Sequence, residues 1–118
     1  MNKPVSFVFV HGAWHNQATW DKVRSGLEEA GYRTYALDLP GAGAKARTPA
    51  SLTASSFDAA AFATEPSPNA GVTQAERTAA VKELVESASS DGSKVVLVGH
   101  SLGGITISPV AEAIPQYL

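Results

Sequence analysis

A short apolar run that ends in a glycine–serine–glycine pattern limits the fold of this chain more than any other feature. Residues 95–98 read Val-Val-Leu-Val, and residues 99–103 read Gly-His-Ser-Leu-Gly. A β-branched apolar run of this length is typical of a strand buried on both faces of a parallel sheet. The G-x-S-x-G spacing then predicts a tight turn into a helix, because small residues two positions before and after the serine let strand and helix pass closely.

Ser101 is the candidate nucleophile at this turn. Its hydroxyl is expected at the C-terminal edge of the sheet, beside the free N–H groups of the helix that begins there. The alternative is a chance match in an ordinary glycine- and serine-rich turn. The apolar residues from Ile105 to Ile114 fit a helix, so the strand–turn–helix context that the motif requires is present. Pro109 predicts a kink or a short first segment in that helix, and Pro115 predicts its end.

The rest of the chain predicts two more strands and two more helices. Residues 5–10 and 32–37 are β-type apolar runs, and residues 16–30 between them carry apolar side chains at helical spacing. Residues 73–76 read Thr-Gln-Ala-Glu, the form of a capping box, and predict the start of a helix that reaches Ala88. This order predicts an α/β fold: a parallel sheet with helices on both faces, which binds ligands at its C-terminal edge.

Residues 41–72 differ from the rest of the chain, because small and polar residues dominate and few large apolar side chains accompany Phe57 and Phe62. We expect a long lid-like segment with a turn of helix near these two rings, inside a single domain that includes all of residues 1–118. The segment opens with a G-x-G-x-x-A pattern typical of dinucleotide sites. Two prolines, Pro40 and Pro49, leave no room for the long helix that such a site requires.

The composition excludes several classes of function. Hydrophobic residues make up 44% of the 118 residues and charged residues 17%, as in an ordinary globular domain. The net charge is −2 and the basic residues are scattered, so we expect neither nucleic acid nor a membrane surface as a partner. No apolar run is long enough for a signal peptide or a membrane span, which favours a cytoplasmic location. Without cysteine, and with three scattered histidines, we expect no metal site and no cofactor.

The loops after the three strands together resemble those of the α/β-hydrolase superfamily. They are residues 11–14 (His-Gly-Ala-Trp), 38–41 (Asp-Leu-Pro-Gly) and 99–104 (Gly-His-Ser-Leu-Gly-Gly), in this order. The first loop and Trp20 look most like the branch of small esterases and hydroxynitrile lyases that includes the plant methyl-ester esterases. The resemblance spans residues 5–114. It implies a partial three-layer sandwich whose strands are the third, fourth and fifth of the family's sheet, in the spatial order fourth, third, fifth.

The resemblance also implies roles for single residues. Ser101 matches the family's nucleophile, and Ala13 and Leu102 match the residues whose backbone N–H groups form the oxyanion hole. His11 is expected to form a hydrogen bond within its own loop, and Asp38 to cap the loop after its strand. A possible substrate pocket includes Gly12, Trp14, His15 and His100, although Trp14 could equally be a core residue and His100 could simply pack locally.

The catalytic base and acid of the family follow the nucleophile in the chain. None of the three histidines matches that base, and no later strand precedes Leu118. We therefore expect residues 1–118 to be the N-terminal half of a longer hydrolase domain that is inactive by itself. Its expected partners are a small-molecule substrate and either the missing half or a second copy, bound at the bare sheet edge beyond residues 95–98.

The predicted function is that of a serine hydrolase acting on a small ester, amide or lactone through an acyl-enzyme at Ser101. One alternative is a carbon–carbon lyase like the hydroxynitrile lyases, which share the turn and the first loop. The other alternative is a non-catalytic module that binds a small hydrophobic carboxylate.

Overall fold

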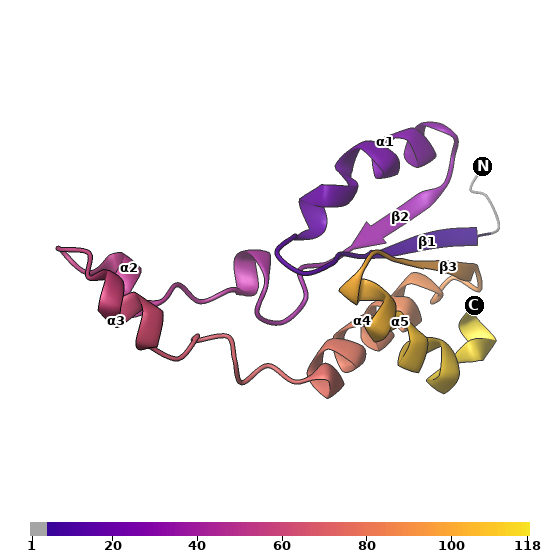
Figure 1. The fold of residues 1–118 in the computed structure, drawn as a ribbon. Helices are drawn as coiled ribbons and strands as arrows, with labels where there is room; N and C mark the ends of the chain where they lie inside the picture. The colour runs from indigo at the N-terminus through magenta and orange to yellow at the C-terminus, as the bar shows by residue number, and fades with distance from the viewer. Residues whose placement is uncertain (1–4) are drawn as a thin grey trace.

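A three-stranded parallel sheet lies at the centre of the computed structural model, which describes residues 5–118 (Figure 1). The strands are β1 (Val5–Val10), β2 (Arg33–Ala36) and β3 (Lys94–Gly99), and their spatial order is β2-β1-β3. In the register of β1 with its neighbours, Phe7 lies opposite Thr34 on one side and Val96 on the other. The predicted α/β fold class and the order fourth, third, fifth are confirmed.

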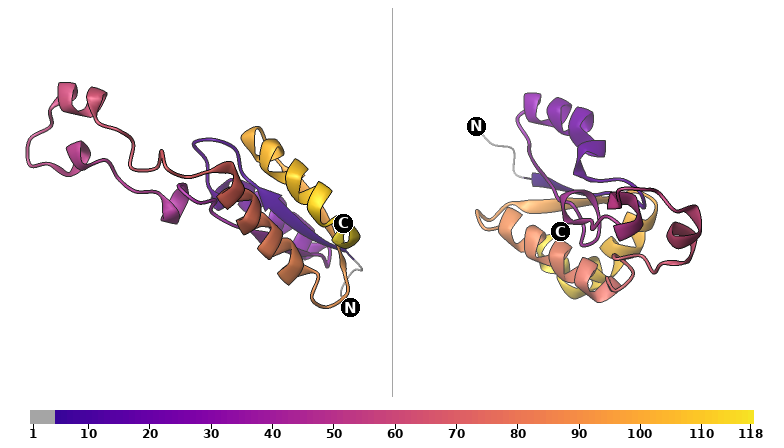
Figure 2. Two further views of the ribbon diagram at one scale, coloured as in Figure 1. Left: turned by 90° about the horizontal axis from the view of Figure 1, so that it is seen from below. Right: turned by 90° about the vertical axis from the view of Figure 1, so that its left-hand side faces the viewer.

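Helices cover both faces of the sheet. Helix α1 (Asp21–Glu29) lies on one face, and α4 (Gln74–Ala88) and α5 (Leu102–Ala113) lie side by side on the other (Figures 1 and 2). The remaining elements are short: the 3-10 turns η1 (Gln17–Trp20), η2 (Gly43–Lys45) and η3 (Pro115–Tyr117) and the helices α2 (Ala50–Thr53) and α3 (Ala59–Thr64).

The central strand β1 is apolar on both faces because each face is covered. Val8 and Val10 are fully buried and belong to the same core cluster as Val81 and Val85 of α4 and Val110 of α5. Burial of each such side chain contributes about 1.5–3 kcal/mol. This explains why the strand reads as an apolar run without polar alternation.

Aromatic rings fill the space on the other face of β1. The ring of Phe7 meets that of Tyr32 edge-on at 5.3 Å, and the ring of Phe9 lies 4.9 Å from that of Trp20. Trp20 is only half-buried, and none of the residues of α1 is fully buried. The face of the sheet that α1 covers is therefore less completely buried than the face that α4 and α5 cover.

The starts and ends of two helices follow local signals. The Thr73 hydroxyl accepts a hydrogen bond from the backbone N–H of Glu76 (3.1 Å), as the capping sequence predicts. Helix α5 runs unbroken through Pro109, so the expected short first segment is absent. Proline has no N–H to donate to the carbonyl of Ile105, and Ile105 is an exposed residue of the helix. The helix ends at Ala113, with Ile114 as its C-cap before Pro115, as predicted.

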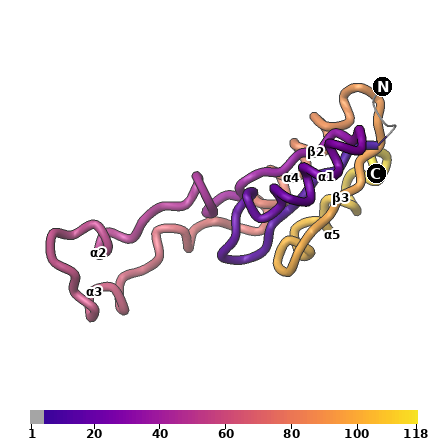
Figure 3. Tube along the Cα trace, turned by 90° about the horizontal axis from the view of Figure 1, so that it is seen from above, coloured from indigo at the N-terminus to yellow at the C-terminus, as the bar shows by residue number. Residues whose placement is uncertain are grey.

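Residues 41–72 extend from the body as an arm that carries η2, α2 and α3 (Figures 1 and 3). Near its tip the rings of Phe57 and Phe62 lie 5.9 Å apart and are both exposed. The turn of helix expected here is α3, which begins at Ala59 with the Asp58 carboxylate as its cap. A lid role for the arm stays a prediction. In the part of the chain that the structure describes, no helix has the length and apolar character needed to cross a membrane.

Candidate active site

Ser101 occupies a strained turn between β3 and α5. Its backbone has φ +55° and ψ −122°, in a region that costs a residue other than glycine about 1–3 kcal/mol, and its side chain is exposed. Backbone hydrogen bonds hold the turn: His100 N–H donates to the Val10 carbonyl (3.1 Å), and Gly103 N–H donates to the His100 carbonyl (2.8 Å). The tight strand-to-helix turn predicted from the sequence is present.

Gly99 and Gly103, on either side of Ser101, have to be glycine because backbone atoms approach them closely. A Cβ atom on Gly99 would lie 2.8 Å from the carbonyl oxygen of Gly103. A Cβ atom on Gly103 would lie 2.5 Å from the carbonyl oxygen of Val10 and 2.8 Å from that of His11. Because these contacts are to backbone atoms, of α5 for Gly99 and of β1 and the loop after it for Gly103, neither position has room for a side chain.

The loop after β1 packs directly against this turn. A Cβ atom on Gly12 would lie 3.0 Å from both the Ser101 Cβ and the His100 carbonyl oxygen. His11 fixes the loop, since its Nδ1 lies 2.8 Å from the Gly12 carbonyl oxygen and its Nε2 accepts from the backbone N–H of Leu39 (3.0 Å). The proton is therefore on Nδ1, and both ring nitrogens are engaged. This agrees with the hydrogen bond expected within the loop.

A hollow of about 520 Å³ lies between the loop after β1 and the start of α5; Leu102, which follows Ser101 in the chain, lines it, whereas Ser101 itself does not. Gly12 and Trp14 of the expected pocket line it, together with Ala13 and Leu102, and the binding of substrate there stays a prediction. Leu102 opens α5, so its N–H has no acceptor within the helix. Trp14 is fully exposed, with φ +62°, and is not a core residue.

His15 and His100 lie outside the wall of this hollow. Their rings meet edge-on with centroids 6.1 Å apart, and His15 Nδ1 lies 2.7 Å from the Ala13 carbonyl oxygen. The structure therefore places the two histidines beside each other on the first loop and the serine turn, and a role for either in substrate binding stays a prediction.

Several residues that line the hollow were missed by the sequence analysis. The polar ones are Asn69 before α4, Gln74 and Arg77 of α4 and Thr106 of α5, and Gln74 Nε2 donates to the Thr106 hydroxyl (3.0 Å). A signal was available, because helical spacing places Gln74 and Arg77 on the same face as the buried Val81. Polar residues at one end of a buried helix face indicate that this end borders a cavity.

Asp38 closes the loop after β2 and is almost fully buried. Its Oδ1 accepts a hydrogen bond from the backbone N–H of Gln17 (2.9 Å), and its Oδ2 accepts from that of Ala44 (3.0 Å). These two donors hold the pKa of Asp38 below its ordinary value, against the opposing effect of burial. Asp38 therefore has the loop-capping role expected from the sequence.

We expect Asp38→Asn to lower the free energy of unfolding by about 1–3 kcal/mol at pH 7, because one backbone N–H would then face an amide NH₂ group. The folded-state pKa of Asp38 lies below the ordinary 3.8, so the carboxylate stabilises the fold above that pH and its contribution is lost as the pH falls through the folded-state pKa. Urea denaturation at pH 7 and at pH 3 should show a smaller difference at pH 3. Asp21→Asn, at an exposed position in α1, is the control, and equal losses in both variants at pH 7 would contradict this role.

The geometry provides an exposed serine on a strained turn, backbone N–H groups beside it and an adjoining hollow. Within residues 5–118, no three histidine or acidic side chains gather closely enough to hold a metal ion. Residues 7–116 match the sequence profile of the alpha/beta hydrolase family. The chain belongs to this family.

Relatives in the family are plant esterases and similar enzymes. Salicylic acid-binding protein 2 of Nicotiana tabacum is 36% identical over 116 residues, which are 98% of this chain and 37% of that protein. Methyl jasmonate esterase 1 of Vitis vinifera is 34% identical over 110 residues, or 93% of this chain and 34% of that protein. The crystal structure of polyneuridine aldehyde esterase superposes with a TM-score of 0.69 at 28% identity, over 98% of this chain and 38% of that one. The chain thus spans little more than a third of the length of these relatives.

Proposed function

We propose that this member of the alpha/beta hydrolase family contributes the nucleophile and the oxyanion hole of a serine esterase that cleaves small carboxylic esters. The observation that carries the proposal is the position of Ser101, exposed on a strained turn with the Gly12 loop packed against it. Backbone held in this unfavourable region occurs mostly at active sites and ligand-binding sites, where it fixes the position of a functional side chain. The names of two relatives, a methyl jasmonate esterase and a polyneuridine aldehyde esterase, agree with this class of substrate.

In the proposed reaction, Ser101 Oγ bonds to the ester carbonyl carbon and its proton passes to a general base. The negative charge that develops on the carbonyl oxygen is stabilised by the backbone N–H groups of Ala13 and Leu102. The bond to the alkoxy group then breaks, the base returns the proton to the leaving alcohol, and water later hydrolyses the acyl-enzyme by the same route.

We propose that the base and its acidic partner come from outside residues 1–118. His11 is unsuited to the role, because its Nδ1 and Nε2 are both bound within the fold. Asp38 is equally engaged, since each of its carboxylate oxygens accepts a backbone N–H. The relatives are about three times as long as this chain, which leaves room for both groups.

Hydrolysis is better supported than either alternative. The relatives named above include esterases, and no feature of the hollow favours carbon–carbon cleavage or binding without turnover. Product analysis separates the classes, because a hydrolase yields an acid and an alcohol whereas a hydroxynitrile lyase yields an aldehyde and cyanide.

The test of the proposal is the intact mass of the protein before and after incubation with a fluorophosphonate probe. We expect one phosphonyl group, located on Ser101 by peptide mapping, when the complete domain is present. A control incubation in urea should give no adduct, because the reactivity of the serine depends on the folded site. A stable adduct on another residue of the native protein would overturn the proposal.

We also propose that the outer edge of β3 is covered by another chain segment or by a second copy. Among residues 5–118, β3 pairs only with β1, and Val96 on this strand is 40% exposed. Unpaired strand edges promote association. Sedimentation of the chain should show self-association, and a monodisperse monomer at all concentrations would contradict this expectation.

A further inference from the structure

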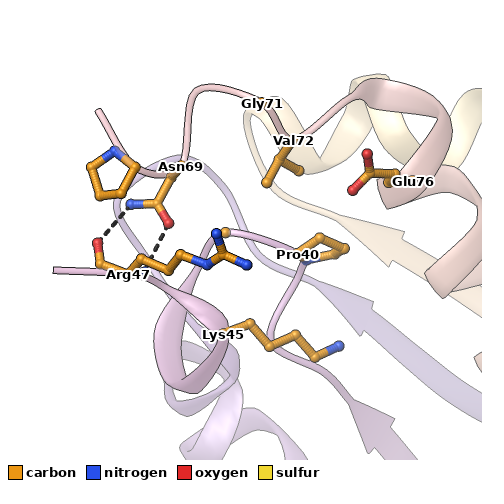
Figure 4. Close-up of a pocket in the computed structure, with 9 residues that line it drawn as sticks. Pro40, Lys45, Arg47, Asn69, Gly71, Val72 and Glu76 are labelled. Atoms are coloured by element: carbon orange, nitrogen blue, oxygen red, sulfur yellow. Dashed lines mark hydrogen bonds between the residues drawn. The ribbon is translucent and has the colours of Figure 1, made fainter. Parts of the chain in front are cut away.

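A second hollow, of about 420 Å³, adjoins the candidate substrate pocket. Pro40, Gly41 and Asn69 line both hollows, so the two share a wall. The second hollow lies where the arm leaves the body, between the segment that follows Pro40 and the start of α4 (Figure 4). The two hollows therefore lie next to each other, one against the start of α5 and the other at the base of the arm.

Three cations and a single carboxylate line the two hollows. Lys45 and Arg47 extend into the second hollow, with Glu76 across from them (Figure 4), and Arg77 lies half-buried in the wall of the first. Within residues 5–118, none of the three cations has an ion-pair partner. Three of the nine lysine and arginine residues of the chain therefore line these hollows.

The cations are held near the pocket by bonds to the backbone around them. The side-chain amide of Asn69 accepts from the backbone N–H of Arg47 (2.8 Å) and donates to its carbonyl (3.0 Å), as the dashed lines in Figure 4 show. Lys45 ends η2, which the Asp38 carboxylate anchors through the N–H of Ala44. These bonds fix the backbone from which the exposed Lys45 and Arg47 side chains extend.

We propose that the two hollows form one binding site for an ester whose far end carries a carboxylate, and that Arg77, Arg47 and Lys45 recognise this carboxylate. The inference rests on the proposed esterase function and names the substrate class of the same site. Guanidinium groups form paired hydrogen bonds with carboxylates, and these are stronger than bonds between neutral groups. Three cations against the one carboxylate of Glu76 leave a net positive charge around the two hollows, which favours an anionic ligand over a neutral one.

Equilibrium binding to the Ser101→Ala variant of the complete protein tests the inference without turnover. Monomethyl glutarate is an ester with a free carboxylate, and dimethyl glutarate is its neutral counterpart. By titration calorimetry at low salt we expect the affinity for the monomethyl ester to be about tenfold or more higher than that for the dimethyl ester. This is the gain expected from one charge-assisted hydrogen-bonded pair between a cation and the free carboxylate. The preference should weaken as salt is added, because exposed charges are screened.

Charge-removing variants locate the recognition site. Arg77→Gln alone should remove most of the preference, and the triple variant K45Q/R47Q/R77Q should bind the two esters equally. Lys82→Gln removes a charge from an exposed position on the same helix and should leave the preference unchanged. Equal affinity for the two esters in the protein that carries only Ser101→Ala would overturn the inference. An undiminished preference for the monomethyl ester in the triple variant would overturn it as well.

The two proposals fail in different ways. If the native protein gives no phosphonyl adduct on Ser101 but prefers the monomethyl ester, the carboxylate site stands and the esterase proposal falls. If Ser101 is labelled and the two esters bind alike, the esterase proposal stands and the carboxylate site falls.

Discussion

Replacement of Ser101 by alanine is expected to abolish fluorophosphonate labelling and to lower ester turnover by the complete enzyme about 10⁴-fold or more, as for other serine nucleophiles. The reason is chemical, since the substitution removes only the Oγ atom that would form the acyl bond. Ser101 is exposed, so the substitution removes no packing, and the free energy of unfolding should change by less than about 0.5 kcal/mol. Intact mass and initial rates measure the first effect, and urea denaturation measures the second.

Ser108→Ala is the matched control for this experiment. Ser108 lies on α5, the helix that begins directly after Ser101, and is exposed. Its hydroxyl donates to the Gly104 carbonyl (2.9 Å), away from the turn. Its loss should leave labelling and turnover unchanged. Ser101→Gly adds a second comparison, because glycine adopts φ +55° without strain and should raise stability while it removes activity. Turnover within a few-fold of the parent in Ser101→Ala would remove Ser101 from the mechanism.

Gly103→Ala is expected to be the most destabilising single methyl addition in the described part of the chain. The new Cβ would lie 2.5 Å from the Val10 carbonyl oxygen and 2.8 Å from that of His11, and both are backbone atoms of the central strand or its loop. These atoms cannot move without separating α5 from β1. We therefore expect the free energy of unfolding to fall by about 3 kcal/mol or more, at the upper end for overpacked sites. Fluorophosphonate labelling of Ser101 should be lost as well.

Gly104→Ala is the control next to it in the chain. No atom lies within 4 Å of a Cβ at this position, which is inside α5. Alanine should therefore stabilise the helix by about 1 kcal/mol relative to glycine. Urea denaturation of the two variants should give changes of opposite sign, and similar changes in both would show that the close approach at Gly103 is relieved by a shift of α5.

The elements of the fold were predictable because each depends on residues that are near one another in the sequence. The run at residues 95–98 and the small residues Gly99 and Gly103 indicate a strand, a turn and a helix, and their contacts with one another explain the spacing. The start of α4 follows from the Thr73 cap in the same way. The path of the helix through Pro109 was not predictable, because it depends on whether the freed carbonyl is exposed.

The composition of the pocket was only partly predictable. Gly12, Ala13 and Leu102 belong to loops that a parallel sheet brings to one edge, so the order of strands was enough to place them. Arg77 comes from a helix on one face of the sheet, and its place in the wall depends on the angle at which α4 packs. Helical spacing places Arg77 on the same face of α4 as the buried Val81, but the packing angle, which decides that this end of the face borders the hollow, is not specified by the local sequence.

The sequence by itself determined the α/β class and the turn at Ser101, because periodicity, capping and the need for small residues are local properties. The spatial order of the strands was implied by the resemblance of the three loops to the α/β-hydrolase superfamily. Only the tertiary structure decided that Trp14 is exposed, that Asn69 ties the arm to the segment at Arg47, and that unpaired cations gather beside the candidate pocket. These features arise where segments distant in the chain meet. Their geometry is set by the packing of whole helices and loops against the sheet, which no short stretch of residues specifies.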